Sequence, residues 1–155
     1  MRRLSGVLLA GAILLLPAFS HGAFAQQAQQ AAPQKTTYTG QVVLAAYVVN
    51  PDKTADYEKV MAQLKDALSK STRPEAKQQL AGWKVVKMSS PGPEGTVIYT
   101  HVITPVNGAD YNLLQIMYAV FTDPAEQKAL YDLYAGSLAK NLGIGSGKVA
   151  VDLSK

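Results

Sequence analysis

Apolar and polar positions change their spacing along the chain, and each pattern predicts one element. The segment QVVLAAYVV, residues 41–49, is almost wholly apolar and rich in β-branched side chains. Such a run is typical of a strand with both faces covered. From Thr54 the apolar residues stand three and four apart, which predicts an amphipathic helix with one buried stripe. The members of this stripe are Tyr57, Val60, Met61, Leu64 and Leu68.

Two further strands are predicted in the middle of the chain. Residues 75–80 predict a short helical turn, and residues 83–88 a strand that follows it. Residues 96–104, TVIYTHVIT, show the clearest strand pattern in the chain. The linking sequence SSPGPEG combines proline and glycine as tight connections do, so these two strands are expected to form an antiparallel hairpin.

The last third predicts two helices and a final strand. Residues 110–121 are apolar almost all round, which is typical of a helix that is deeply buried or lies at an interface. Asp123 and Pro124 together predict the start of the next helix, as cap and first helical residue. The glycines of GIGSGK, residues 143–148, predict a helix end and a turn, because the pattern of a phosphate-binding loop is broken. Residues 148–153 alternate and predict the last strand.

The first residues predict export. Arg2 and Arg3 precede an apolar run at residues 7–16, and Ala23 and Ala25 stand where a signal peptidase reads. We expect cleavage after Ala25, then a disordered leader over residues 26–37 and one domain over residues 38–155. The apolar run is too short to span a membrane comfortably, so no membrane insertion is expected after cleavage. The expected location is the periplasm or the exterior.

The order of predicted elements defines the fold class. Strand, helix, strand, strand, split helix, strand is the split βαβ plan of an α+β, ferredoxin-like fold with a four-stranded antiparallel sheet. Helices then cover only one face of the sheet, yet the first strand is apolar on both faces. The open face is therefore expected to meet a second sheet, which a homodimer would supply.

Three segments in this order resemble the dimeric α/β-barrel superfamily. They are NPDKTADYEKVMAQLKDAL, GWKVVK and VIYTHVITPVNGADY, and the likeness extends over about residues 38–153. More narrowly, the chain resembles small exported bacterial proteins of this architecture whose activity is unassigned. Antibiotic-biosynthesis-type monooxygenases, haem-degrading enzymes and dye-decolourising peroxidases share the architecture. None of their residue motifs is found here, and a shared fold does not carry function.

Candidate chemistry centres on a few residues. His101 is the only histidine outside the predicted signal segment, so it is the candidate for acid–base work or haem ligation. The alternative is a strand histidine that is bonded to a neighbour. Asp110 and Tyr111 follow a loop that could place a carboxylate and a phenol at a pocket mouth. More simply, Asp110 caps the following helix and Tyr111 packs beneath it.

Aromatic residues supply the candidate ligand-binding set. Those on elements expected to face the interior are Tyr47, Trp83, Tyr99, His101 and Tyr118, although aromatics in such positions are often simply core. No metal site is expected, since the chain has no cysteine and no cluster of carboxylates at ligand spacing. The net charge is +4, and cleavage of the signal segment would remove the two positive charges of Arg2 and Arg3. The remaining lysines are interspersed with acidic residues, so no nucleic acid partner is expected.

Three functions remain open from the sequence. The first is an exported dimeric domain that holds a small apolar or aromatic molecule between sheet and helices, with no cofactor. The second is a cofactor-free or haem-using oxidoreductase of monooxygenase type, with His101 as base or ligand. The third is a structural dimer of the cell envelope. Whether the chain is an enzyme is undecided at this stage.

Overall fold

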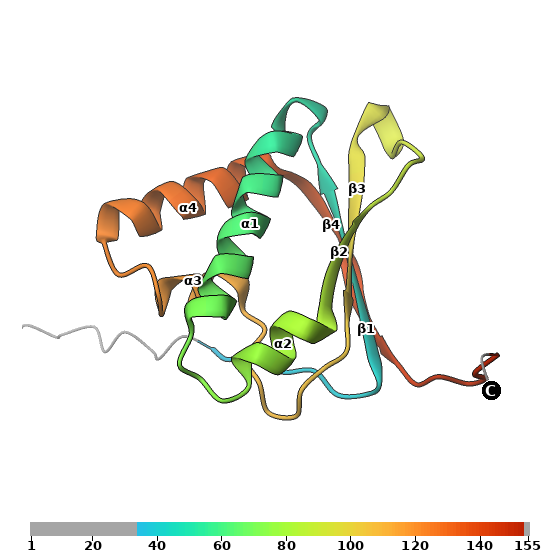
Figure 1. Ribbon diagram of the computed structural model, residues 1–155. Helices are drawn as coiled ribbons and strands as arrows, with labels where there is room; N and C mark the ends of the chain where they lie inside the picture. Colours follow the sequence, from blue (N-terminus) through green and yellow to red (C-terminus); the bar gives the residue numbers. More distant parts are fainter. Residues whose placement is uncertain (1–33, 154–155) are drawn as a thin grey trace, which may run out of the picture. The chain divides into compact units, whose positions relative to one another are not determined.

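The computed structural model describes residues 34–153, and these form an α+β unit (Figure 1). The expected signal segment, its cleavage site and most of the expected leader lie outside the described residues. Within them, no helix is long and apolar enough to cross a membrane. The described chain already joins the domain at Thr36, inside the range expected for the leader. Its N–H donates to Asp110 Oδ1 at 2.9 Å, and its carbonyl accepts from Tyr111 N at 2.7 Å.

Four antiparallel strands form one sheet in the order β2-β3-β1-β4. The strands are β1 (Val42–Val49), β2 (Trp83–Lys87), β3 (Val97–Ile103) and β4 (Leu138–Gly147). As predicted, β2 and β3 form a hairpin, in which Val85 lies opposite His101. This topology is consistent with a ferredoxin-like plan.

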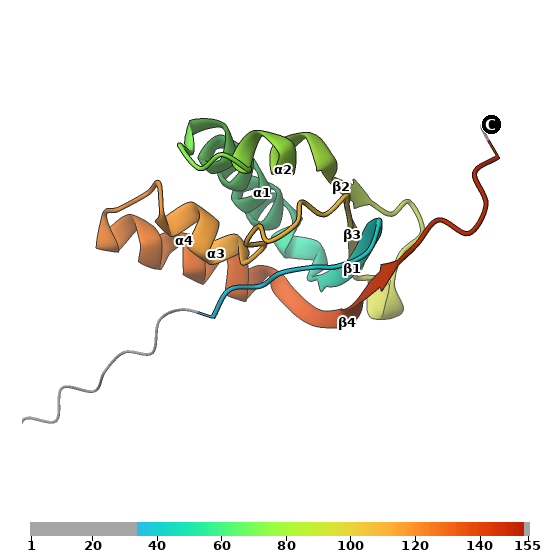
Figure 2. The same cartoon turned by 90° about the horizontal axis from the view of Figure 1, so that it is seen from below.

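The helices gather on one face of the sheet, as Figures 1 and 2 show. They are α1 (Thr54–Lys70), α2 (Ala76–Gly82), α3 (Leu113–Tyr118) and α4 (Pro124–Ser137). A 3₁₀ turn, Pro51–Lys53, leads from β1 into α1. The predicted stripe of α1 is confirmed, because Tyr57, Val60, Leu64 and Leu68 are buried. The predicted start of α4 is also confirmed, since the Asp123 side chain accepts from the N–H groups of Ala125 and Glu126.

Side-chain alternation divides β1 into an inner and an outer set. Val43, Ala45 and Val49 are buried toward the helices, whereas Leu44 is 50% exposed on the outer face. In this single chain the outer face is therefore open at Leu44, although the sequence predicted a strand covered on both sides. Val48, further along the same face, is 5% exposed. The outer face also carries Val86 of β2, which is 43% exposed.

The final strand was placed wrongly by its sequence pattern. Residues 138–147 form β4 directly after α4, whereas residues 148–153 lie beyond the sheet. The predicted turn at the glycines of residues 143–148 is wrong for the same reason. Pairing runs from Val42 opposite Gly147 to Val49 opposite Leu138, with two register irregularities. This long ladder outweighs the weak strand preference of glycine, because strand formation depends on neighbours more than on composition.

The apolar segment at residues 110–121 forms a shorter helix than predicted. Only Leu113–Tyr118 is helical, and its N-cap is Asn112, whose side chain accepts from Gln115 N at 3.2 Å. Asp110 was expected to be the cap, so this prediction is wrong. Asp110 Oδ1 instead accepts from Asn112 N at 2.9 Å and from Thr36 N, which closes a turn ahead of the helix. The expected burial of the helix is confirmed for Ile116 and Met117.

Candidate functional site

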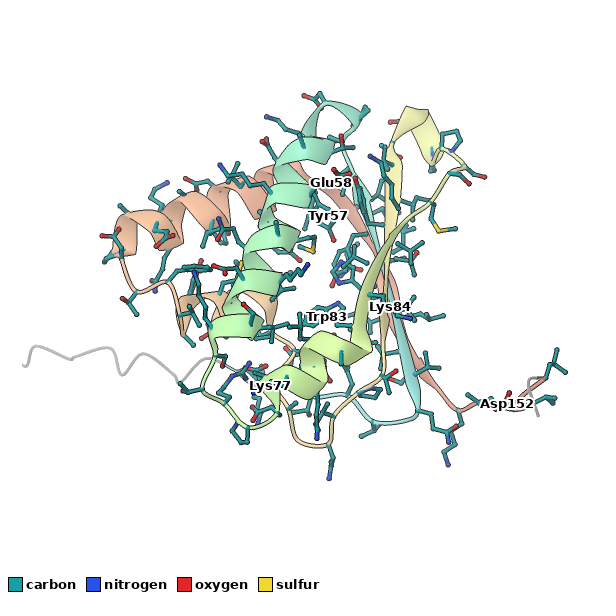
Figure 3. The ribbon with its side chains drawn as sticks, in the orientation of Figure 1. Tyr57, Glu58, Lys77, Trp83, Lys84 and Asp152 are labelled. Atoms are coloured by element: carbon teal, nitrogen blue, oxygen red, sulfur yellow. The ribbon has the colours of Figure 1, made fainter. Side chains whose placement is uncertain are left out.

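A buried imidazole joins three elements on the inner face of the sheet. His101 of β3 is 2% exposed. Its Nδ1 accepts from the indole N–H of Trp83 in β2 at 3.1 Å. Its Nε2 lies 2.7 Å from the hydroxyl of Tyr57 in α1. Figure 3 shows Tyr57 and Trp83 in the space between α1 and the sheet. Both ring nitrogens thus have protein partners.

Burial sets the charge of this ring. The pKa of His101 is lowered from 6.5 to about 4, because the charged form would lose its hydration. The indole adds a second reason, since an indole N–H can only donate and would oppose a proton on Nδ1. The imidazole is therefore neutral at pH 7. It is neither a cation for an acidic ligand nor, in this arrangement, a base with a free lone pair.

A cavity of about 190 Å³ lies next to His101, between the sheet and the helices. Its walls come from the segment before β1, from all four strands, from the loop at Tyr111, and from α3 and α4. The rings that line it belong to Tyr38, Tyr47, Trp83, His101, Tyr111 and Tyr134. Thr36 and Asn112 add polar groups, and no charged side chain belongs to the lining. The cavity is thus aromatic, with polar groups but no fixed charge.

The rings around the cavity contact one another. The centroids of Tyr47 and His101 are 4.9 Å apart, and those of Trp83 and Tyr111 are 5.5 Å apart. Tyr38 and Tyr111 lie 5.2 Å apart. Such tilted pairs each add about 0.5–1.5 kcal/mol beyond the area they bury. Each ring therefore restricts its neighbour, which gives the cavity a defined shape.

The phenols of this region stay protonated at neutral pH. Burial raises the pKa of Tyr47, and the hydrogen bond with Tyr134 opposes part of that shift. Burial also raises the pKa values of Tyr134 and Tyr57, and the neighbouring phenols add to the effect. A protonated phenol can donate one hydrogen bond and accept others. The cavity thus offers hydroxyl donors to a bound molecule and no phenolate.

The predicted ligand-binding residues separate into two groups. Tyr47, Trp83 and His101 meet at the cavity. Tyr99 is on the same sheet face but lies outside the lining, where its hydroxyl donates to Glu58 Oε1 at 2.5 Å. Tyr118 also lies outside, packed against the core between the helices. The pKa of Glu58 is lowered, first by the Tyr99 hydrogen bond and then by Lys87, which lies 2.9 Å away.

The two predicted catalytic candidates have clear structural partners. Asp110 accepts two backbone N–H groups, as described above. Tyr111 is 4% exposed, and its hydroxyl accepts from Val106 N at 2.8 Å. Its ring nevertheless forms part of the cavity wall. Both residues therefore hold the loop that closes one side of the cavity.

Sequence reasoning missed Tyr38, Tyr57 and Tyr134 as members of this region. Tyr57 carried a signal, because it begins the buried stripe of α1 and so had to face the sheet. Tyr134 lies in the helix whose start Asp123 and Pro124 predict, but a helical pattern does not distinguish a core residue from a cavity wall. Tyr38 stands ahead of the first strand, where no periodic pattern exists to place it.

A second hollow lies between α1, α2 and β2. Its volume is about 360 Å³, and its lining is almost wholly apolar. The residues concerned are Met61, Leu64, Leu68, Leu80, Trp83 and Val85, with Lys65 at the side. Among residues 34–153, no group of three or more histidines and carboxylates is arranged to hold a metal ion.

Comparison of the chain with protein-family models, curated proteins and solved structures found no significant match.

Proposed function

We propose that the protein is an exported, dimeric domain that binds a small neutral aromatic molecule between its sheet and its helices. The observation that carries the proposal is the cavity beside His101, which is largely aromatic and has no charged side chain in its lining. Pockets for small molecules are usually apolar, with a few polar groups that orient the ligand. Tyr47 and Tyr134 are the orienting groups in this proposal.

Size and polarity narrow the class of ligand. An apolar cavity of about 150 Å³ is large enough for benzene, so a cavity of about 190 Å³ suits one ring or a small fused pair. A charged ligand would lose its hydration and find no counter-ion, which is costly. The phenol donors favour a ligand with one oxygen acceptor on a flat ring. A phenol, a quinone or a ring ketone has this character.

The oxidoreductase alternative requires more of the same residues. A histidine that acts as base or haem ligand needs a nitrogen free of protein partners. In His101 both nitrogens are engaged, by Trp83 and by Tyr57. One of these bonds would have to break before the ring could act. Ligand binding requires no such change, so we favour it.

The open outer face of the sheet supports the dimer within this proposal. Leu44 and Val86 are exposed there, and register places Leu44 beside Val102 of β3. Apolar side chains grouped on an uncovered sheet face favour association with a second sheet. A structural dimer of the envelope would share this face, so ligand binding is what separates the two functions.

Trp83 makes the binding test direct, because it is the only tryptophan in the chain and it lines the cavity. We expect 2-naphthol to change its fluorescence in a saturable way. The matched 2-naphthalenesulfonate should bind at least about tenfold more weakly, because the cavity offers its charge no partner. Equal binding of both probes, or no saturable change with either, would contradict the proposal.

A pair of neighbouring alanines supplies the matched control. Ala45 lines the cavity, whereas Ala46 follows it on the other side of β1. Ala45→Leu should abolish the naphthol response by filling the space, and Ala46→Leu should preserve it. Circular dichroism verifies that both variants fold. Purification of the full-length product from its own host, with an absorbance scan and native mass spectrometry, then identifies any retained ligand and the oligomeric state.

A further inference from the structure

The segment after β4 leaves the sheet with its apolar side chains exposed. Val149, Val151 and Leu153 are 59%, 72% and 93% exposed. They alternate with other residues, so an extended backbone places them on one side. Both ribbon views show this segment running away from the helices, on the side where the sheet is open (Figures 1 and 2). An alternating apolar segment of this kind is suited to pair with a sheet edge.

Strand β2 offers such an edge. Among residues 34–153 it pairs only with β3. The bonds that flank it are Thr104 N to Gly82 O at 2.8 Å and Met88 N to Ile98 O at 2.9 Å. Because bonded and non-bonded positions alternate in an antiparallel pair, the N–H and C=O groups of Val85 and Lys87 point to the free edge. These groups can bind a further strand.

The apolar groove between α1, α2 and β2 lies beside this edge. Val85 is 37% exposed and forms one wall of the groove. Met61 and Leu64 of α1 form the opposite wall. A strand added next to β2 would place every second side chain over this groove, since side chains in register share a face. The edge and the groove thus form one surface for a segment with alternating apolar residues.

We propose that residues 148–153 of one copy add as a fifth strand to β2 of a second copy, with Val149, Val151 and Leu153 over the groove. Alternate residues of a strand are about 6.6 Å apart, so these three span about 13 Å. Trp83, Val85 and Lys87 span the same length on β2. The segment and the edge therefore match in length and in spacing.

Charge supports the same alignment. Asp152 alternates with Val151 and Leu153, so it would lie on the outer side of the added strand. Lys84 occupies the outer side of β2, where Figure 3 shows it pointing away from the helices. An acid beside a lysine on one sheet face is a favourable cross-strand pair. If the added strand faced the other way, Asp152 would lie over the apolar groove and its carboxylate would lose its hydration.

The acceptor is a second copy because the segment is too short to pair with its own β2. A strand added at the free edge of β2 would lie four strand spacings, or about 19 Å, from β4. Six extended residues span only about 20 Å, so the crossing would leave none of them to pair. The segment also leaves toward the open side, where a partner sheet would lie. This inference rests on the proposed function, which includes a dimer formed through the outer sheet face. To that dimer it adds the exchange of residues 148–153 between the two copies.

Cysteine cross-linking tests the exchange directly, because the chain has no cysteine of its own. A full-length Val85→Cys protein is mixed with isotopically heavy Val149→Cys, Val151→Cys or Leu153→Cys protein and oxidised. We expect a light–heavy disulfide from at least one of these three variants, and the strand register determines which one lies beside Val85→Cys. Ala150→Cys, on the other side of the segment, should give at least about fivefold less.

The outcomes separate the exchange from the dimer. The sample is first shown to be dimeric by native mass spectrometry. If it then gives no cross-link, or an equally strong one from residue 150, the exchange is overturned and the sheet-to-sheet dimer stands. A monomeric wild type would overturn both. Ligand binding is read separately from Trp83 fluorescence, so it does not depend on either result.

A pair of charge variants supplies a second readout. Val151→Asp should raise the dissociation constant of the dimer at least about tenfold, because it removes one buried apolar side chain from the contact. Ala150→Asp introduces the same charge on the other side and should change the constant less than about threefold. Both residues are exposed in the single chain, so neither substitution disturbs its core. Equal effects of the two variants would overturn the exchange.

Discussion

The indole N–H of Trp83 donates to Nδ1 of His101 at 3.1 Å, and this contact assigns the proton on the ring. Since Nδ1 accepts, the proton of the neutral imidazole lies on Nε2. Nε2–H then donates to the hydroxyl of Tyr57 at 2.7 Å. In this bond the Tyr57 hydroxyl is the acceptor. One neutral imidazole thus connects β2, β3 and α1.

This arrangement predicts a loss of stability in mild acid. The folded pKa of His101 is about 4, below the unfolded value of 6.5, so the unfolded chain binds the proton more readily. The stabilising contribution is complete above pH 6.5, falls as the pH drops toward 4, and changes no further below. The shift corresponds to about 3 kcal/mol of unfolding free energy. Urea unfolding followed by circular dichroism at pH 7, 5.5 and 4 measures it.

A histidine variant isolates this contribution from that of the carboxylates. His101→Gln removes the titrating group, so the gap in unfolding free energy between wild type and variant should narrow from pH 7 to pH 4. A gap that stays constant over this range would show that His101 does not titrate with a lowered pKa. A nitrogen-detected NMR titration provides an independent reading, with Nε2 protonated and Nδ1 bare at pH 6.

The second prediction concerns the partner on α1. Tyr57→Phe removes the acceptor of the Nε2 proton and leaves a buried donor without a partner. We expect a loss of about 1–3 kcal/mol in unfolding free energy. Tyr131→Phe makes the same chemical change at a side chain that is 51% exposed, and should have almost no effect. Similar losses in the two variants, measured by urea unfolding, would contradict the role of Tyr57.

Sequence patterns predicted those elements whose burial is one-sided. The stripe of α1 and the hairpin of β2 and β3 follow from spacing and turn chemistry, and the Asp123 cap of α4 follows from local hydrogen bonding. These signals are local, because each depends on residues close in the chain. Tyr47, Trp83 and His101 could likewise be placed on inward faces by alternation.

Long-range pairing explains what the sequence could not predict. Leu138–Gly147 has the glycine content of a turn, yet it forms β4 because it lies along the whole length of β1. Residues 148–153 have the better strand pattern but no partner within the described chain. Asp110 resembled a cap, but its carboxylate accepts the N–H of Thr36, which is 74 residues away in sequence. Such distant partners leave no periodic trace.

The third prediction concerns this long-range contact. Asp110→Ala removes the acceptor shared by the N–H groups of Thr36 and Asn112. Thr36 then keeps only the bond from Tyr111 N, so the segment before β1 should be held less firmly. Because Thr36 and Tyr38 line the cavity, the same substitution should also weaken the binding of 2-naphthol. Hydrogen exchange by NMR should show faster exchange at residues 36 and 112. Asp123→Ala, which removes the acceptor of two other backbone N–H groups at the start of α4, should leave both amides protected.

The fourth prediction compares two glycines of β4 and gives opposite signs. Gly143 has φ of +117°, which only glycine adopts readily, whereas Gly145 has an ordinary backbone. A Cβ at either position would meet no atom within 4 Å, so space does not distinguish them. Gly143→Ala should cost about 1–3 kcal/mol through backbone strain.

Gly145→Ala should instead stabilise by about 0.4–1 kcal/mol, because it restricts the unfolded chain without straining the native one. Register places the two glycines beside Ala46 and Leu44, two residues apart on the same outer face, so association through that face would affect both variants alike. Urea unfolding at one protein concentration therefore compares them directly. A similar loss in both would mean that the outer face, and not the backbone angle, requires glycine there, because a closely packed partner sheet would leave no room for either methyl group.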